Sequence, residues 1–164
     1  MKTLLLMRHA KSDWDAVYES DHDRPLNDRG LKSAGLMGRV LADEGLVPDL
    51  IISSTALRAR TTAELANDAG NWGSELVLDR SLYDDGPKGV LERGASAPNV
   101  KTLMLVGHQP TWSMLVSAVT GERAEMKTAT VAVIELHIES WADLPGTSGT
   151  LIRVLEPRSH DRES

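Results

Sequence analysis

The sequence predicts an α/β fold: a three-layer α/β/α sandwich around a mostly parallel central sheet, with an antiparallel strand pair near the C-terminus. Short apolar runs rich in branched residues alternate with longer segments of helical periodicity, which is the pattern of an α/β layer fold. The chain has 164 residues, the usual size of one domain, and no repeat or linker divides it. We therefore expect a single domain over residues 1–157, followed by a polar tail at 158–164.

Six segments are predicted to be strands, at residues 3–7, 50–52, 76–78, 103–106, 130–137 and 150–155. The first four alternate with helical segments, so they are expected to be parallel. The last two follow one another and are joined by a loop that contains Pro145-Gly146, which favours an antiparallel pair.

Four segments are predicted to be helices. The first has its apolar face over residues 31–41 and ends near Gly45, and the second follows residues 53–55, a predicted N-cap, and closes at Gly70. A small helix is expected over 87–93. The last has Pro110 in its first turn and ends at Gly121.

Composition excludes several classes of function. Hydrophobic residues make up 41% of the chain and charged residues 26%, as in soluble globular proteins. There is no cysteine, which excludes thiolate catalysis, disulfides and cysteine metal sites. The net charge of −6 argues against general nucleic-acid binding. The N-terminal apolar run is too short for a signal-peptide core, and no run approaches the roughly 20 residues of a membrane span, so we expect a cytoplasmic protein without membrane contact.

Three of the predicted strands are followed by residues that suit an anion site. The first runs into Arg8-His9, the second is followed by Arg58 at a helix start, and the fourth runs into Gly107-His108. In open α/β sheets, ligands bind outside the carboxyl ends of the strands. We therefore expect these two arginines and two histidines to meet, although about a hundred positions separate them.

These residue types fit phosphoryl transfer. Arginine matches phosphate oxygens bidentately and keeps its charge, whereas a neutral imidazole can attack and carry a phosphoryl group. Arg8, Arg58 and a protonated His108 would bind the equatorial oxygens while His9 attacks in line. Backbone N–H groups at the helix start near Thr55 would add donors.

Each residue alone has a simpler interpretation. A single histidine after a strand is more often a hydrogen-bonded structural residue. An arginine at a helix start, such as Arg58, is usually solvated, with Glu64 or Asp68 as an ion-pair partner. The combination favours a site, because Arg8 directly after a buried strand needs a partner. The remaining histidines are interpreted as structural or solvated: His22, His137 and His160.

Three motifs then resemble a known family. Residues 6–12, LMRHAKS, resemble the "RHG" signature of the histidine phosphatase superfamily, with alanine in the glycine position. Residues 53–63 are similar to its second-arginine segment, and residues 106–110, VGHQP, to its second-histidine segment. The RHAKS form, the short length and the stretch DHDRPLNDRG at 21–30 resemble the SixA-type phosphohistidine phosphatases most closely.

The resemblance implies a phosphoglycerate-mutase-like three-layer fold, a phosphohistidine intermediate, and no metal or other cofactor. Carried over by motif, it makes His9 the nucleophile. It makes Arg8, Arg58 and His108 the phosphate-binding residues.

Two departures from the family pattern bear on the substrate. Asp15 stands where mutase-like members often carry a phosphate-binding asparagine. A carboxylate there would repel phosphate, which argues against the hypothesis of a mutase. Asp84, in the segment 82–84, stands where many members supply a glutamate as general acid. Asp84 or Asp85 is a candidate proton donor, with an ordinary turn before Gly86-Pro87 as the alternative. A weak acid would suit phosphohistidine, whose leaving nitrogen can be protonated before cleavage.

The favoured function is a phosphatase that acts through phospho-His9 on phosphohistidine in a protein. The segment 71–100, between the helix that ends near Gly70 and the strand region that begins at Lys101, is too short for a lid, so an open site is expected. A phosphatase of a small phosphorylated metabolite and a non-catalytic phosphate-binding module remain alternatives. A metal site at His9 and His108 ranks lowest, because two ligands are too few.

Overall fold

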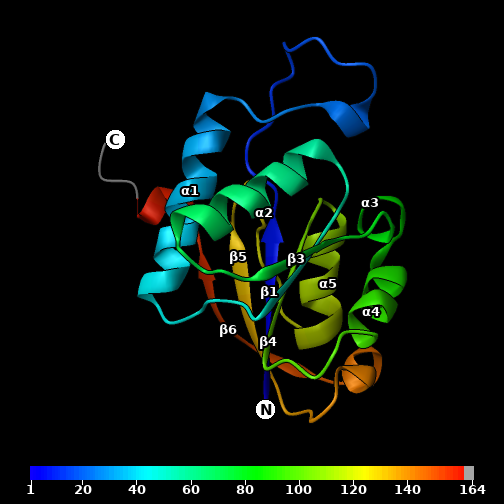
Figure 1. Cartoon of the computed structure of the whole chain (residues 1–164). Helices are drawn as coiled ribbons and strands as arrows, with labels where there is room; N and C mark the ends of the chain where they lie inside the picture. The colour runs from blue at the N-terminus through cyan, green and yellow to red at the C-terminus, as the bar shows by residue number, and fades with distance from the viewer. Residues whose placement is uncertain (161–164) are drawn as a thin grey trace.

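The structure, a computed structural model, describes residues 1–160 and contains one six-stranded sheet (Figure 1). Its strands lie in the order β3-β2-β4-β1-β5-β6. Their bounds are β1 Lys2–Arg8, β2 Leu50–Ser53, β3 Glu75–Leu78, β4 Thr102–Gly107, β5 Val131–Leu136 and β6 Gly149–Leu155. The first four strands are parallel, whereas β5 runs antiparallel to β1 and β6 antiparallel to β5. The predicted fold class is confirmed.

Helices cover both faces of this sheet (Figure 1). One face packs against α1 (Asp28–Asp43) and α2 (Leu57–Ala69), and the other against α4 (Pro87–Ala95) and α5 (Thr111–Thr120). A short helix, α3 (Ser81–Asp84), precedes α4. Three 3-10 helices complete the described chain: η1 Asp21–Asp23, η2 Trp141–Gly146 and η3 Pro157–Ser159.

Alternation along β1 explains the two layers of core. Leu4 and Leu6 belong to the apolar cluster on the α5 side, whereas Leu5 and Met7 belong to the cluster on the α1 and α2 side. Successive side chains of a strand point to opposite faces of a sheet, so a run of consecutive apolar residues fits a strand that is covered on both sides.

Some boundaries differ from the expectation. The prediction of an N-cap within residues 53–55 is wrong, because α2 begins at Leu57 after Ala56, which has no side-chain cap. Ser54 instead accepts from the N–H of Ala56, 3.1 Å away. The predicted tail begins inside η3, and residues 161–164 lie outside the described part of the chain. Among the helices formed by residues 1–160, none has the length and apolar character needed to span a membrane.

Gly107, the last residue of β4, allows the Trp112 ring to pack against the strand end. A Cβ at this position would overlap the indole, which is fully buried and donates from Nε1 to the carbonyl of Leu105 at 3.1 Å. The absence of a side chain at Gly107 therefore lets α5 pack close to the strand that carries His108.

We predict that Gly107→Ala lowers the free energy of unfolding by about 1–3 kcal/mol, the usual cost of overpacking a core. Urea unfolding of the variant measures this loss. Gly146→Ala is the matched control, since a Cβ there meets nothing within 4 Å. Equal stability of the Gly107 variant and the control would contradict this account of the β4–α5 contact.

Candidate active site

His9 is fixed by hydrogen bonds from three parts of the chain. Its N–H donates to the carbonyl of Gly107 at 3.0 Å, and its carbonyl accepts from the N–H of Ala129 at 3.0 Å. The next residue, Ala10, donates to the hydroxyl of Thr62 on α2 at 2.9 Å. The His9 side chain is only 7% exposed, so the imidazole has a defined position at the carboxyl end of β1.

The hydrogen bonding of His9 determines which ring nitrogen is free. Nδ1 lies 2.7 Å from the carbonyl oxygen of Ala10. A carbonyl can only accept, so Nδ1 carries the proton and Nε2 holds the lone pair. Burial lowers the pKa of His9 to about 3, and the charges of His108, Arg58 and Arg8 act in the same direction, against the raising effect of the Ala10 bond. The ring is therefore neutral and nucleophilic at neutral pH.

Arg58, in the first turn of α2, is buried and directed toward η1. It is 6% exposed, and its two terminal nitrogens donate to Asp21, one to the carbonyl at 2.7 Å and one to Oδ2 at 2.9 Å. The simpler interpretation, a solvated arginine paired with Glu64 or Asp68, does not apply, because Glu64 pairs with Arg60 instead.

Asp21 is the carboxylate that organises the arginines. Burial by itself would raise its pKa, but the hydrogen bonds from Arg24, Arg58 and Tyr83 have the larger effect and lower the pKa to about 2. Asp21 is therefore ionised at neutral pH and holds Arg58 in place.

His108, directly after β4, lies beside His9 with 5.2 Å between the ring centroids. Its Nε2 is 2.8 Å from the Ser54 hydroxyl, and the Tyr83 ring packs edge-on against it. Burial, followed by the charge of Arg58, lowers the pKa of His108 to about 4, despite an opposite effect of Asp21. Without a bound anion, His108 is therefore neutral at neutral pH, and its protonation against a bound phosphoryl group stays a prediction.

Arg8, at the end of β1, is hydrogen-bonded to the loop that follows α5. Its backbone N–H donates to the carbonyl of Thr130 at 3.1 Å, and its guanidinium donates to the carbonyl of Met126 at 3.1 Å. The Nε of the same guanidinium is buried and has no partner in the protein.

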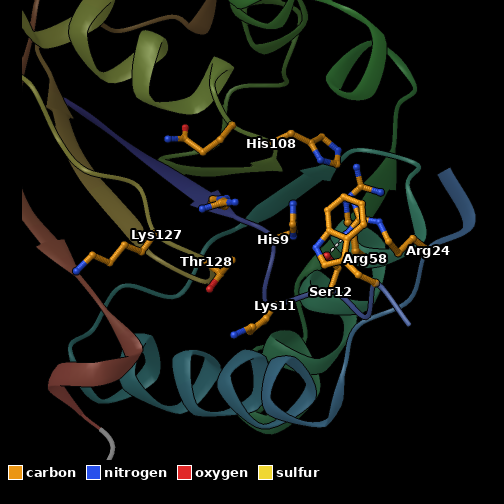
Figure 2. Close-up of a pocket in the computed structure, with 11 residues that line it drawn as sticks. His9, Lys11, Ser12, Arg24, Arg58, His108, Lys127 and Thr128 are labelled. Atoms are coloured by element: carbon orange, nitrogen blue, oxygen red, sulfur yellow. Dashed lines mark hydrogen bonds between the residues drawn. The ribbon is translucent and has the colours of Figure 1, made fainter. Parts of the chain in front are cut away.

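These residues share one cavity of about 530 Å³ (Figure 2). The residues that line it are Arg8, His9, Lys11, Ser12, Trp14, Arg24, Arg58, His108, Gln109, Lys127 and Thr128. Figure 2 shows Arg58 and Arg24 on one side of His9, with Lys127 and Thr128 on the other. None of these described lining residues is a carboxylate, although the chain as a whole carries a net charge of −6.

Four buried donors or potential donors of this cavity have no hydrogen-bond partner in the protein: Arg8 Nε, Arg24 Nε, Arg58 Nε and His108 Nδ1. Buried polar atoms are nearly always hydrogen-bonded, so four such atoms on the residues of one cavity indicate a polar ligand. Their positive environment indicates an anion.

The sequence interpretation missed Arg24. It is 4% exposed, donates to the hydroxyl of Ser12, and donates to Asp21 Oδ1 at 3.1 Å. The guanidinium carbon of Arg24 lies 3.6 Å from the centroid of a Trp14 ring. The signal for it in the sequence is the motif at 21–30, which contains Arg24.

The carboxylates singled out from the sequence lie away from the cavity lining. Asp84 is half-exposed and accepts from Arg80 at 2.9 Å, one turn earlier. Neither Asp84 nor Asp85 is among the lining residues, and Asp15 is exposed. From the segment 82–84 it is Tyr83 that reaches the site residues, through a 3.0 Å hydrogen bond from its hydroxyl to Asp21.

Two of the backbone N–H groups just before α2 are already bonded within the protein. The N–H of Ser54 donates to the carbonyl of Val106 at 2.9 Å, and that of Ala56 donates to Ser54 Oγ. Across residues 1–160, no three histidine or carboxylate side chains are grouped so that they could hold a metal ion.

Comparisons with known proteins relate the chain to one family. Residues 4–84 match the family model of the histidine phosphatase superfamily, branch 1. A Mycobacterium tuberculosis protein without an assigned activity is 36% identical over 165 residues, covering 93% of this chain and all of that one. A crystal structure from Agrobacterium tumefaciens, described as a candidate phosphohistidine phosphatase SixA, superposes with a TM-score of 0.81 and 32% identity, covering 95% and 98% of the two chains.

A mutase is also related over part of its length. The 2,3-bisphosphoglycerate-dependent phosphoglycerate mutase of Mycobacterium leprae is 42% identical over 72 residues, which is 43% of this chain and 29% of the mutase. This similarity relates the two proteins over part of their length.

The two buried histidines predict a dependence of stability on pH. Their pKa values are about 3 and about 4 in the folded chain, against roughly 6.5 for a free imidazole. Below pH 6.5 the unfolded chain therefore binds more protons than the folded one. The free energy of unfolding should fall as the pH is lowered from 7 to 5, by up to about 1.4 kcal/mol per pH unit for each histidine.

Urea unfolding at pH 7 and pH 5 measures this effect. The His9→Gln/His108→Gln double variant should lose most of the difference between the two pH values. If the double variant kept the full pH dependence of the wild type, the buried, neutral state of these rings would be disproved.

Proposed function

Because the chain belongs to the histidine phosphatase superfamily, we propose that it is a phosphatase in which His9 receives the phosphoryl group. The observation that carries the proposal is the state of His9. Its Nε2 lone pair belongs to a neutral imidazole that lines a cavity with Arg8, Arg24 and Arg58. A phosphoryl group in this cavity would meet both a nucleophile and the cations that stabilise its equatorial oxygens.

In the proposed first step, Nε2 of His9 attacks phosphorus while the bond from phosphorus to the leaving group breaks. Arg8 and Arg58 bind the phosphoryl oxygens, and the Nδ1–H bond to Ala10 stabilises the positive ring that forms. In the second step, water attacks phosphorus and the bond to Nε2 breaks. Inorganic phosphate leaves, and His9 returns to the neutral form.

The leaving group needs a proton, and this need favours one class of substrate. No carboxylate is among the described residues that line the cavity, and His108, with its pKa lowered to about 4, is neutral at neutral pH. An alkoxide leaving group would receive little acid assistance here. The nitrogen of phosphohistidine can take its proton from solvent before cleavage. We therefore favour phosphohistidine as the substrate, with Asp84 as a proton donor only if the segment 81–84 moves.

A protein-borne phosphohistidine needs an accessible site. Of the residues that line the cavity, none comes from 71–100, the segment in which a lid would have to be inserted. This favours a phosphorylated protein as the partner. A small phosphorylated metabolite is the second candidate, because a volume of about 530 Å³ is also typical of small-molecule pockets.

We predict that His9→Ala abolishes phosphatase activity, with a loss of at least about 10³-fold in kcat, because the substitution removes the lone pair that attacks phosphorus. His137→Ala is the matched control, since His137 lies outside this cavity. Release of inorganic phosphate from a phosphorylated histidine domain measures both. Activity that survives in His9→Ala would exclude the covalent mechanism. A wild type that binds phosphate but shows no turnover would instead indicate a non-catalytic phosphate-binding module.

The same assay separates the two substrate classes. We expect a higher kcat/KM for the phosphorylated histidine domain than for sugar phosphates and nucleotides. The opposite order would make a small ester the substrate while leaving the role of His9 intact.

A further inference from the structure

Trp14 is an unusual residue in the cavity lining. It is 70% exposed, although large aromatic side chains are normally buried for most of their area. The other described lining residues are charged or polar, so Trp14 provides the one large apolar surface there. The phosphoryl oxygens would be bound by the arginines and histidines, and the indole ring is not required to bind them. The indole is therefore available to the group that carries the phosphoryl group.

The indole is also held in a fixed orientation. One of its faces covers the guanidinium of Arg24, at 3.6 Å from the ring centroid to the guanidinium carbon. Arg24 is itself buried and joined to Ser12 and Asp21 by hydrogen bonds. Asp21 in turn binds Arg58. This chain of contacts ties the indole to the same framework that positions the phosphate-binding arginine.

We propose that Trp14 forms a leaving-group subsite that takes a planar unsaturated ring, the imidazole of phosphohistidine or an aryl group, against its exposed surface. The inference rests on the proposed function, since it assigns the leaving group of the same reaction. The ring of the substrate packs on the indole while its phosphoryl group reaches His9 and the arginines. Aromatic pairs of this kind contribute beyond simple burial of area.

Three substrates isolate the contribution of the ring. Phosphohistidine and phosphoramidate both have a nitrogen leaving group, but of these two only phosphohistidine carries a ring. Phenyl phosphate carries a ring on an oxygen leaving group. Trp14→Ala should lower kcat/KM for phosphohistidine and for phenyl phosphate by roughly 3- to 10-fold, the effect of one aromatic contact, and change that for phosphoramidate less than twofold. Trp14→Phe should restore most of the loss.

Val17→Ala is the control, because Val17 is a fully exposed apolar residue of the same loop but does not line the cavity. It should leave all three substrates unchanged. A loss on only one of the two ring substrates would also support the ring subsite and would identify the kind of ring that it takes. An equal loss on all three substrates would overturn the proposal, because it would mean that Trp14 acts only by holding Arg24.

A binding measurement keeps this inference separate from the proposed catalysis. Calorimetry with phenylphosphonate and methylphosphonate, which are not hydrolysed, should show tighter binding of the phenyl compound to the wild type. The difference should disappear in Trp14→Ala and persist in His9→Ala. Equal affinities in the wild type would overturn the ring subsite even in an active phosphatase, whereas inactivity together with selective binding would overturn only the proposed function.

Discussion

The parallel pairing of β1 with β4 is the constraint on which the site depends. Arg8 is in register with Gly107, and the N–H of His9 continues the ladder by donating to the carbonyl of Gly107. Two segments about a hundred residues apart in sequence therefore end at the same edge of the sheet, and their histidine rings lie 5.2 Å apart. Everything else in the cavity is arranged around this pair.

Two further networks complete the arrangement. From α2, Thr62 fixes the peptide of Ala10, and the carbonyl of Ala10 fixes the tautomer of His9. From η1, Asp21 binds Arg24 and Arg58 together. The carboxylate does not line the cavity, so it orients the arginines while the lining itself stays positive. Burial of the two histidines keeps both rings neutral, which gives one of them its nucleophilic lone pair and makes the folded chain sensitive to acid.

Much of this was predictable from the sequence, for physical reasons. Buried strands are continuous apolar runs, and residues that follow parallel strands must meet at one edge, so the positions of Arg8, His9, Arg58 and His108 could be inferred. The segment 11–24 could not be, because it lacks periodicity and its role depends on contacts distant in sequence, such as that between Asp21 and Arg58. The neutral state of His108 without a bound anion could not be inferred either, because burial and a neighbouring arginine determine it, and neither is visible in a motif.

The atom of the enzyme that carries the phosphoryl group shows which histidine attacks phosphorus, and through which ring nitrogen. The wild type should be mixed with phosphorylated substrate, quenched in alkali to preserve phosphohistidine, and analysed by ³¹P NMR and peptide mass spectrometry. The proposed mechanism predicts a single labelled peptide that contains His9, with phosphorus on Nε2, because Nδ1 is bonded to the Ala10 carbonyl. Phosphorus on Nδ1, or on His108 instead of His9, would contradict it.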